Sequence, residues 1–201
     1  MTYEELPQTL PIFPLHGVLL LPGGNLPLNI FEKRYLAMFD DALRDNRLIG
    51  IIQPRVTGAP ELYSVGCAGR ITAFEETPDG RYEIKLKGVS RFRFEDELEQ
   101  VSGYRRVAPL WDEFRDDTDQ EKKCLGVKRE KLKGLLKKYF EREGMNCDWH
   151  AVDGATDGKL ITCLSMTCPF EPVEKQALLE EKCCKKRSEM FMTLLEMEVC
   201  K

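Results

Sequence analysis

The chain has 201 residues, a net charge of −4, 42% hydrophobic residues and 32% charged residues. This length allows one core, or one core with a small attached bundle, and excludes a large multidomain machine. No apolar run reaches the roughly 18 residues that a membrane-spanning helix needs. The start is acidic at Glu4 and Glu5 and lacks the basic residues of a secretory signal. We therefore expect a globular, cytoplasmic protein.

The first elements predicted along the chain are two short strands and a helix. Apolar runs over 10–15 and 18–21 predict the strands, and Pro22-Gly23-Gly24-Asn25 predicts a turn after them. From Phe31 the apolar period changes from two to about 3.6, which predicts a helix over 31–43.

A β-hairpin is predicted between Val65 and Asp96. Alternating runs flank Pro78-Asp79-Gly80, whose Asp-Gly pair is typical of a hairpin turn. In the second strand, Gly88 predicts a bulge or a bend. Arg91 and Arg93 flank Phe92 and are expected to point toward water, opposite to the ring. A last strand is predicted over 104–110.

The acidic stretch 112–119 separates a strand-like pattern from a helical one. The sequence therefore predicts a β-rich domain over 1–118 and an α-helical bundle over 119–201. The predicted helices cover 120–143 before Gly144, 156–167 with Thr156 as N-cap, a segment from Pro172 through Leu179, and 185–199.

The opening segment carries a recognisable order of residues, namely Pro11, Pro14, Leu15, Val18, Pro22, Gly23, Pro27, Leu28, Ile30, Phe31, Glu32, Arg34 and Tyr35. This order resembles the opening of the Lon amino-terminal domain, the part of Lon proteases that contacts protein substrates. The hairpin around Asp79-Gly80 extends the resemblance over 10–112. A weaker resemblance, to the helical region of standalone bacterial members, rests on 166–170 and 174–179.

The resemblance implies an α+β fold: a β-rich, PUA-like pseudo-barrel with one helix, followed by a helical bundle. It also implies a non-catalytic module, without the ATPase and peptidase domains of Lon, that binds extended or unfolded polypeptide as an adaptor in protein quality control. A protease or a chaperone is the further partner expected. The candidate peptide-binding residues are Leu19, Leu21 and Phe31, which are apolar and close to the presumed sheet edge, although such residues are more often core than groove.

No catalytic residue or cofactor is predicted. The stretch from Gly154 to Leu160 is one residue short of a phosphate loop and has Leu where Ser or Thr must reach magnesium. Ser90 lacks the second glycine of a nucleophile elbow. His16 and His150, the two possible bases, are read as packed or surface histidines.

Eight cysteines are present, and all are expected to be free thiols because the chain is long enough to fold by burial and lacks an export signal. Cys147-x-x-His150 is half of a zinc site without a matching second half, so no metal is predicted.

Two other functions stay open. A nucleic-acid-binding module of PUA-like fold could use the basic side chains of 120–143, although the acidic pI of about 5.4 counts against it. The alternative reading of this segment is a solvated helix face whose charges Glu130 and Glu141 partly neutralise. A small hydrolase or transferase with an unrecognised site is the third hypothesis.

Overall fold

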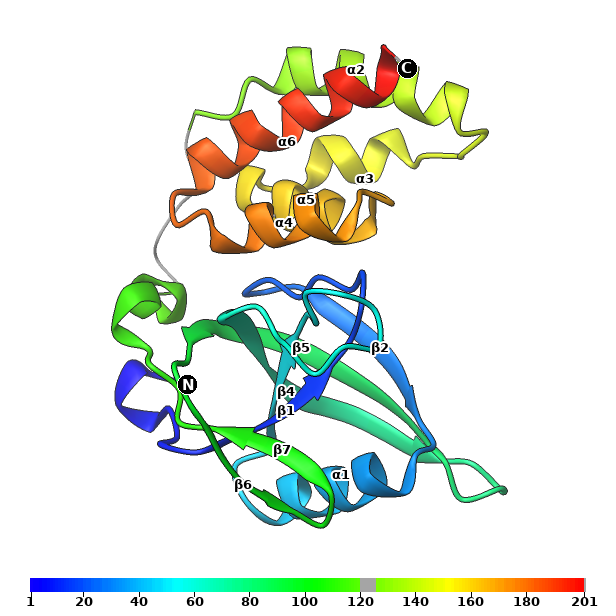
Figure 1. Ribbon diagram of the computed structural model, residues 1–201. Helices are drawn as coiled ribbons and strands as arrows, with labels where there is room; N and C mark the ends of the chain where they lie inside the picture. Colours follow the sequence, from blue (N-terminus) through cyan, green and yellow to red (C-terminus); the bar gives the residue numbers. More distant parts are fainter. Residues whose placement is uncertain (120–125, 201) are drawn as a thin grey trace. The chain divides into compact units, whose positions relative to one another are not determined.

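The computed structural model of the protein describes residues 1–119 and 126–200. The chain divides into two compact units, Met1–Glu121 and Lys122–Lys201 (Figure 1). The described part of the first unit contains every strand and the described part of the second is helical. The fold is therefore α+β, as the sequence predicts.

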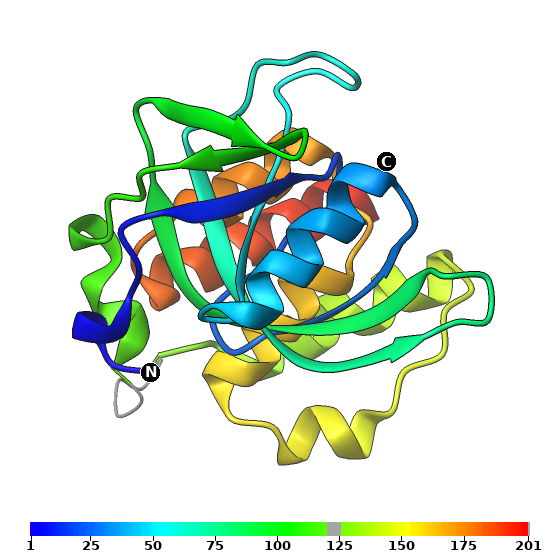
Figure 2. The same cartoon turned by 90° about the horizontal axis from the view of Figure 1, so that it is seen from below.

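Unit 1 contains one mixed sheet in the order β2-β5-β4-β3-β1-β7-β6. Among the described strands, only β1 and β3 pair in parallel. Among the described residues no ladder joins β2 to β6, so the sheet is curved but open and does not close into a barrel (Figure 2). The strands are β1 (Leu10–Pro14), β2 (Asn25–Ile30), β3 (Leu48–Ile52), β4 (Val65–Glu76), β5 (Tyr82–Arg93), β6 (Glu97–Val101) and β7 (Tyr104–Val107).

One α-helix, α1 (Lys33–Arg44), lies across one end of the curved sheet (Figure 2). Its buried side chains are Tyr35, Met38, Phe39 and Ala42, which follow the predicted helical period. The helix begins two residues later than predicted, so Phe31 stays outside it. A short 3-10 helix, η1 (Tyr3–Glu5), precedes the sheet.

The strand predicted over 18–21 does not form, which corrects the sequence analysis. Leu19, Leu20 and Leu21 are buried in succession, with 2%, 1% and 0% exposure, whereas a half-buried strand buries alternate residues. The strand forms after the turn instead, as β2, and tolerates Pro27 because β2 is the edge of the sheet.

The chain around this turn is held against Gly88 of β5. The Gly23 N–H donates to the Gly88 carbonyl at 2.9 Å, and the Gly88 N–H donates to the Gly24 carbonyl at 2.8 Å. A Cβ at Gly88 would lie 2.1 Å from the carbonyl oxygen of Leu21. The close approach of two backbones therefore requires glycine here.

The predicted hairpin forms as β4 and β5. The register steps from Ala68 opposite Ser90 to Gly69 opposite Gly88, which leaves Val89 as the extra residue of a bulge next to Gly88. The core beneath the sheet includes Leu10, Ile12, Leu48, Ile52, Ala68, Phe92, Phe94, Val107 and Trp111.

The acidic stretch after the last strand forms a 3-10 helix, η2 (Asp112–Thr118), which packs against β5. Arg91 is 3% exposed, and its guanidinium donates to the Asp117 carboxylate at 2.7 and 2.8 Å. Arg93 bonds the Glu113 carboxylate at 2.5 Å. The expectation that both arginines point to water is therefore wrong for Arg91, which is buried. It is also corrected for Arg93, whose guanidinium binds Glu113, because η2 brings carboxylates over the strand.

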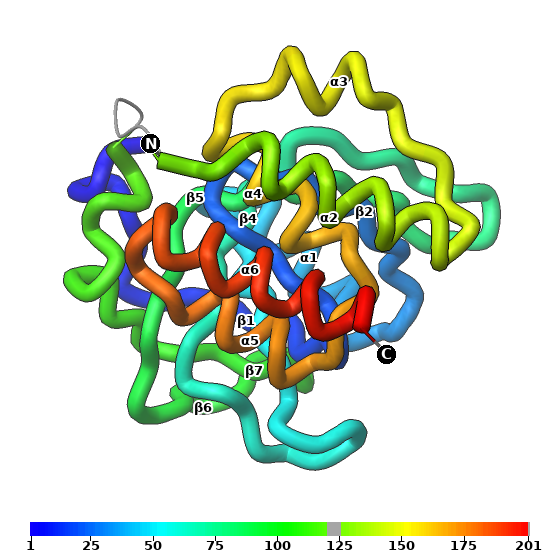
Figure 3. Tube along the Cα trace, turned by 90° about the horizontal axis from the view of Figure 1, so that it is seen from above, coloured from blue at the N-terminus to red at the C-terminus, as the bar shows by residue number. Residues whose placement is uncertain are grey.

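Unit 2 consists of α2 (Arg129–Arg142), α3 (Trp149–Gly154), α4 (Asp157–Thr167), α5 (Pro172–Glu180) and α6 (Cys184–Val199). Helices α2 and α6 run side by side (Figure 3). The predicted cap is confirmed, since the Thr156 hydroxyl accepts from the Lys159 N–H at 3.5 Å. The sequence analysis missed α3, whose N-cap Asp148 accepts from two backbone N–H groups.

The first predicted helix is shorter than expected. Residues 126–128 are not helical, since Gly126 has φ of +87°, and 120–125 lie outside the described residues. None of the helices in the described ranges is long and apolar enough to span a bilayer.

Candidate functional site

Three strands of unit 1 form an arm at the β2 end of the sheet, from which the hairpin tip projects (Figure 1). We define the arm by residues 25–30, 70–76 and 82–87. On β5, Ile84 and Leu86 are buried, and the residues alternating with them are exposed on the outer face. The register groups these outer residues into rungs: Asn25, Lys87 and Arg70; Pro27, Lys85 and Ala73; Asn29, Glu83 and Glu75.

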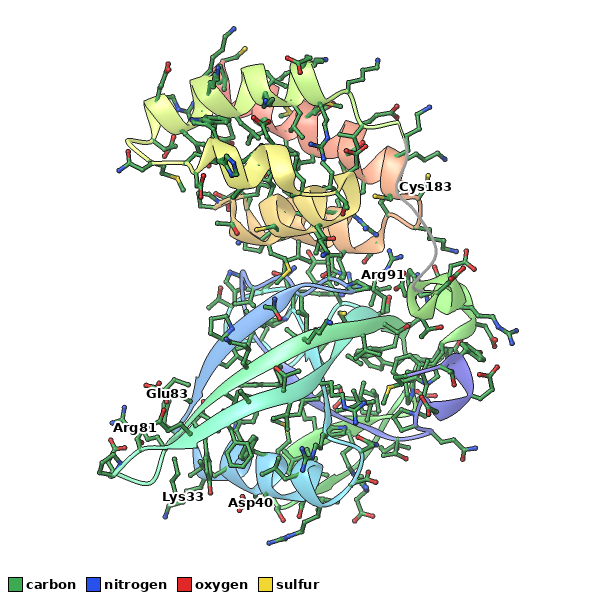
Figure 4. The ribbon with its side chains drawn as sticks, turned by 180° about the vertical axis from the view of Figure 1, so that it is seen from behind. Lys33, Asp40, Arg81, Glu83, Arg91 and Cys183 are labelled. Atoms are coloured by element: carbon green, nitrogen blue, oxygen red, sulfur yellow. The ribbon has the colours of Figure 1, made fainter. Side chains whose placement is uncertain are left out.

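A hollow of about 530 Å³ lies on the arm. Its lining includes all six outer-face residues of the last two rungs, and each of them is exposed. The short side chains of Ala73 and Pro27 on either side of Lys85 leave the space. Glu83 lies on the side of the arm away from Lys33 and Asp40 of α1 (Figure 4). Leu28, Phe74 and Ile84 complete the lining, so all three strands of the arm frame the hollow.

Charges on the outer face are arranged by sign. Arg70 is opposite Lys87 in the register, and two rungs away Glu75 is opposite Glu83. Like charges directly opposite each other destabilise a sheet. Within residues 1–119 and 126–200, none of these four side chains forms an ion pair. The outer face thus has a basic end and an acidic end, with Lys85 between them.

The inner face of the arm is aromatic. The ring centroid of Phe39 on α1 lies 5.4 Å from that of Phe74 and 4.6 Å from that of Tyr82. Loss of solvation raises the pKa of the Tyr82 phenol. Phe74 nevertheless remains 50% exposed, so α1 covers this face only in part.

The turn at the tip of the arm is held by side chains. The Thr77 hydroxyl donates to the Asp79 carboxylate at 2.5 Å, and the Arg81 guanidinium lies 2.9 Å from the same group. The hydrogen bond from Thr77, followed by the charge of Arg81, holds the pKa of Asp79 below its ordinary value.

The three predicted binding residues are separated by the fold. Leu19 and Leu21 are 2% and 0% exposed and belong to the core, whereas Phe31 is 61% exposed. The Arg81 guanidinium lies 5.9 Å from the centre of the Phe31 ring, so this phenylalanine reaches the arm.

The backbone of β2 has one free side, since β5 is its only neighbour in the described sheet. The Gly24 carbonyl accepts a hydrogen bond from the Gly88 N–H of β5. The backbone N–H and C=O groups of every second residue after Gly24 therefore also point toward β5. The N–H and C=O groups of Asn25 and Asn29 therefore point outward, and Pro27 adds a carbonyl but no N–H.

The basic side chains of α2 are largely paired inside unit 2. Lys131 lies 2.7 Å from Glu196, Arg129 lies 2.6 Å from Asp157, and Lys133 pairs with Asp153. Lys137 lies over the Trp149 ring at 5.6 Å. This pairing leaves few charges of the described helix for a phosphate backbone.

The expectation of eight free thiols is wrong, because Cys184, among the described cysteines, is disulfide-bonded. Sequence spacing did not indicate which cysteines folding brings together, and Cys124 lies outside the described residues. Six other described cysteines are not in disulfides: Cys67, Cys147, Cys163, Cys168, Cys183 and Cys200. His16 and His150 are exposed, and the described residues contain no group of three or more side chains suited to holding a metal.

The sequence analysis missed the outer-face residues of the arm. The alternation of Glu83, Lys85 and Lys87 with buried residues was a visible signal on β5. The neighbours on β2 and β4 were not visible, since pairing between β2 and β5 joins segments about 57 residues apart and depends on tertiary structure.

Comparisons with known proteins assign the chain to a family. The model for the ATP-dependent protease La (LON) substrate-binding domain matches residues 9–197. Lon protease 2 of Myxococcus xanthus is 31% identical over 200 residues, which cover 96% of this chain and 24% of that protein. Lon protease of Anaeromyxobacter dehalogenans is 30% identical over 202 residues, with 96% and 23% covered. The chain thus spans about a quarter of the length of these relatives.

A solved structure agrees with this assignment. The Lon N-terminal domain protein from Xanthomonas campestris has a TM-score of 0.65 and 26% identity, covering 92% of this chain and 97% of that one. The match lies within the substrate-binding domain of Lon, over residues 9–197. The chain belongs to the family of Lon substrate-binding domains.

Proposed function

We propose that this chain is a non-catalytic, cytoplasmic module that binds extended or unfolded polypeptide on the arm of unit 1 and acts as an adaptor that presents it to a protease. The family supports the polypeptide as ligand. The observation that carries the proposal is the 61% exposed Phe31 ring directly after the open edge strand β2.

The arm suits an extended chain for physical reasons. A client strand can pair with the outward groups of Asn25 and Asn29, while an apolar client side chain covers Phe31. Pro27 limits the length of the ladder, which keeps the edge from pairing with itself. Ordering the client costs about 1–2 kcal/mol per fixed residue, so binding is weak and favours unfolded over native proteins.

The test is titration of the full chain with a reduced, carboxymethylated, permanently unfolded model protein at low and high salt. Phe31→Ala should weaken binding about tenfold or more, because burial of a phenylalanine contributes about 1.5–3 kcal/mol. Val56→Ala is the matched control, since Val56 is 64% exposed and lies outside the arm. Equal affinity of the Phe31→Ala variant and the control would contradict the proposal.

Nucleic acid is the second candidate, through the basic helix α2. Its phosphate contacts would weaken steeply with salt, whereas apolar burial and backbone hydrogen bonds are screened far less. The ion pairs of Lys131 and Arg129 count against it. Binding of an oligonucleotide alone, lost at high salt and abolished by neutralising Lys137 and Lys138, would favour this candidate.

Absence of catalysis is a separate expectation. The purified chain should hydrolyse neither ATP nor peptides, because Lys159 follows no phosphate loop and Ser90 no nucleophile elbow. ATP turnover that survives repurification and disappears in Lys159→Ala would contradict it.

A further inference from the structure

Two observations on the outer face of the arm are not explained by polypeptide binding in general. The first is the juxtaposition of like charges, Arg70 with Lys87 and Glu75 with Glu83, on neighbouring strands. The second is the hollow of about 530 Å³ lined by the acidic pair and by Lys85. Each like-charged pair is a cost that the isolated fold does not offset among its described residues.

A bound ligand of opposite local charge would remove this cost. A cation between Glu75 and Glu83 would face two carboxylates, and an anion between Arg70 and Lys87 would face a guanidinium and an ammonium group. Because Arg70, Lys87, Glu75 and Glu83 are all exposed, a ligand can reach them without opening the core.

The distance between the two pairs sets the ligand's length. Lys87 and Glu83 are four residues apart on β5, which corresponds to roughly 13 Å along a strand. A client lying extended along the arm advances by the same rise per residue. Its two charges should therefore be four residues apart, and side chains at that spacing project from the same side of an extended chain.

We infer that the outer face of the arm selects extended polypeptide segments that carry one basic and one acidic residue four positions apart. The inference rests on the proposed function and specifies its client class. The client pairs with the edge of β2, so its basic side chain reaches across the outer face toward Glu83, over the hollow, and its acidic side chain reaches toward Lys87. The inference does not fix the direction of the client chain. A client with its basic residue first and a client with its acidic residue first fit the two pairs in opposite directions along the strand.

The probes are four extended nine-residue peptides with the same apolar anchor in a Ser-rich background. They carry Lys and Glu at i and i+4, Lys and Lys at i and i+4, Glu and Glu at i and i+4, or Lys and Glu at i and i+2. At low salt the Lys/Glu i, i+4 peptide should bind the full chain about threefold to fivefold tighter than the others. The preference should shrink at high salt.

Charge-reversal variants of the protein provide the decisive test. Glu83→Lys places a cation opposite Glu75, and Lys87→Glu places an anion opposite Arg70, so each variant should lose the preference for the Lys/Glu i, i+4 peptide. Glu95→Lys is the control, because Glu95 is equally a surface carboxylate outside the arm and should leave the order unchanged. Circular dichroism of each variant checks that the fold is retained.

The outcomes separate this inference from the proposed function. Binding of the unfolded model protein that depends on Phe31, combined with equal affinity for all four peptides, would overturn the charge selection alone. No binding of any polypeptide would overturn both. An unchanged peptide order in Glu83→Lys and Lys87→Glu would also contradict the selection.

Discussion

Where β4 and β5 lie in the body of the sheet, over 65–71 and 86–92, most side chains are buried and the backbone approaches its neighbours closely. Over 72–76 and 82–85 the same two strands expose most of their side chains and carry uncompensated like charges. One hairpin thus serves two purposes. Its buried half stabilises unit 1, and its exposed half should tolerate changes of charge with little effect on stability.

The largest effect that would test this division is at Gly88. Gly88→Ala should lower the free energy of unfolding by about 3 kcal/mol, because the new methyl group meets the Leu21 carbonyl at 2.1 Å and the backbone must move. Glu75→Ala on the exposed half should change it by less than about 0.5 kcal/mol. Urea unfolding of both variants measures the difference. Similar losses of stability in the two variants would contradict the division of the hairpin into a stabilising half and a tolerant half.

Arg91→Ala should cost about 3 kcal/mol, since removal of the guanidinium leaves the 11% exposed Asp117 carboxylate with the backbone N–H of residue 91 but without a counter-charge. Arg70→Ala, on the outer face of β4, is the matched control and should be nearly neutral. Urea denaturation in a Trp149→Phe background, followed by the fluorescence of Trp111, reports unit 1. Equal stability of the two variants would show that η2 is not fastened by this pair.

Removing one like charge should stabilise the arm slightly. Glu83→Gln is expected to raise the free energy of unfolding by up to about 0.5 kcal/mol, because Glu75 no longer faces a second carboxylate. A thermal unfolding series at low and high salt measures this gain, which should vanish as salt screens the repulsion. A loss of stability would mean that Glu83 has a structural partner.

The smallest effect is a pH dependence at the tip of the arm. The pKa of Asp79 is lowered by Thr77 and Arg81, so its contribution to the turn is present above the ordinary carboxyl range. That contribution is lost as pH falls through the depressed folded-state pKa. An NMR titration should find the pKa of Asp79 below the ordinary value of 3.8, and Thr77→Val should raise it.

Much of the fold was predictable from local patterns. Alternation around Asp79-Gly80 predicted the hairpin, Gly88 predicted the bulge, and Thr156 and Pro172 marked helix starts. These predictions succeed because each depends on hydrogen bonds or burial within a few neighbouring residues.

The failures have a common physical cause. The strand expected over 18–21 failed because three consecutive leucines are buried by contacts distant in sequence, and Arg91 was expected in water because its partner Asp117 lies 26 residues away. Of the predicted binding residues, burial left only Phe31 on the surface.

The sequence by itself determined the α+β class, the family resemblance, the hairpin and most helix boundaries, because these follow from periodicity, turn residues and capping groups. Tertiary structure alone decided the strand order, which places β2 beside β5 and leaves its other edge open. It also decided which charges stand opposite one another on the arm. The reason is that pairing between distant strands depends on the free energy of the whole core, which no local pattern encodes.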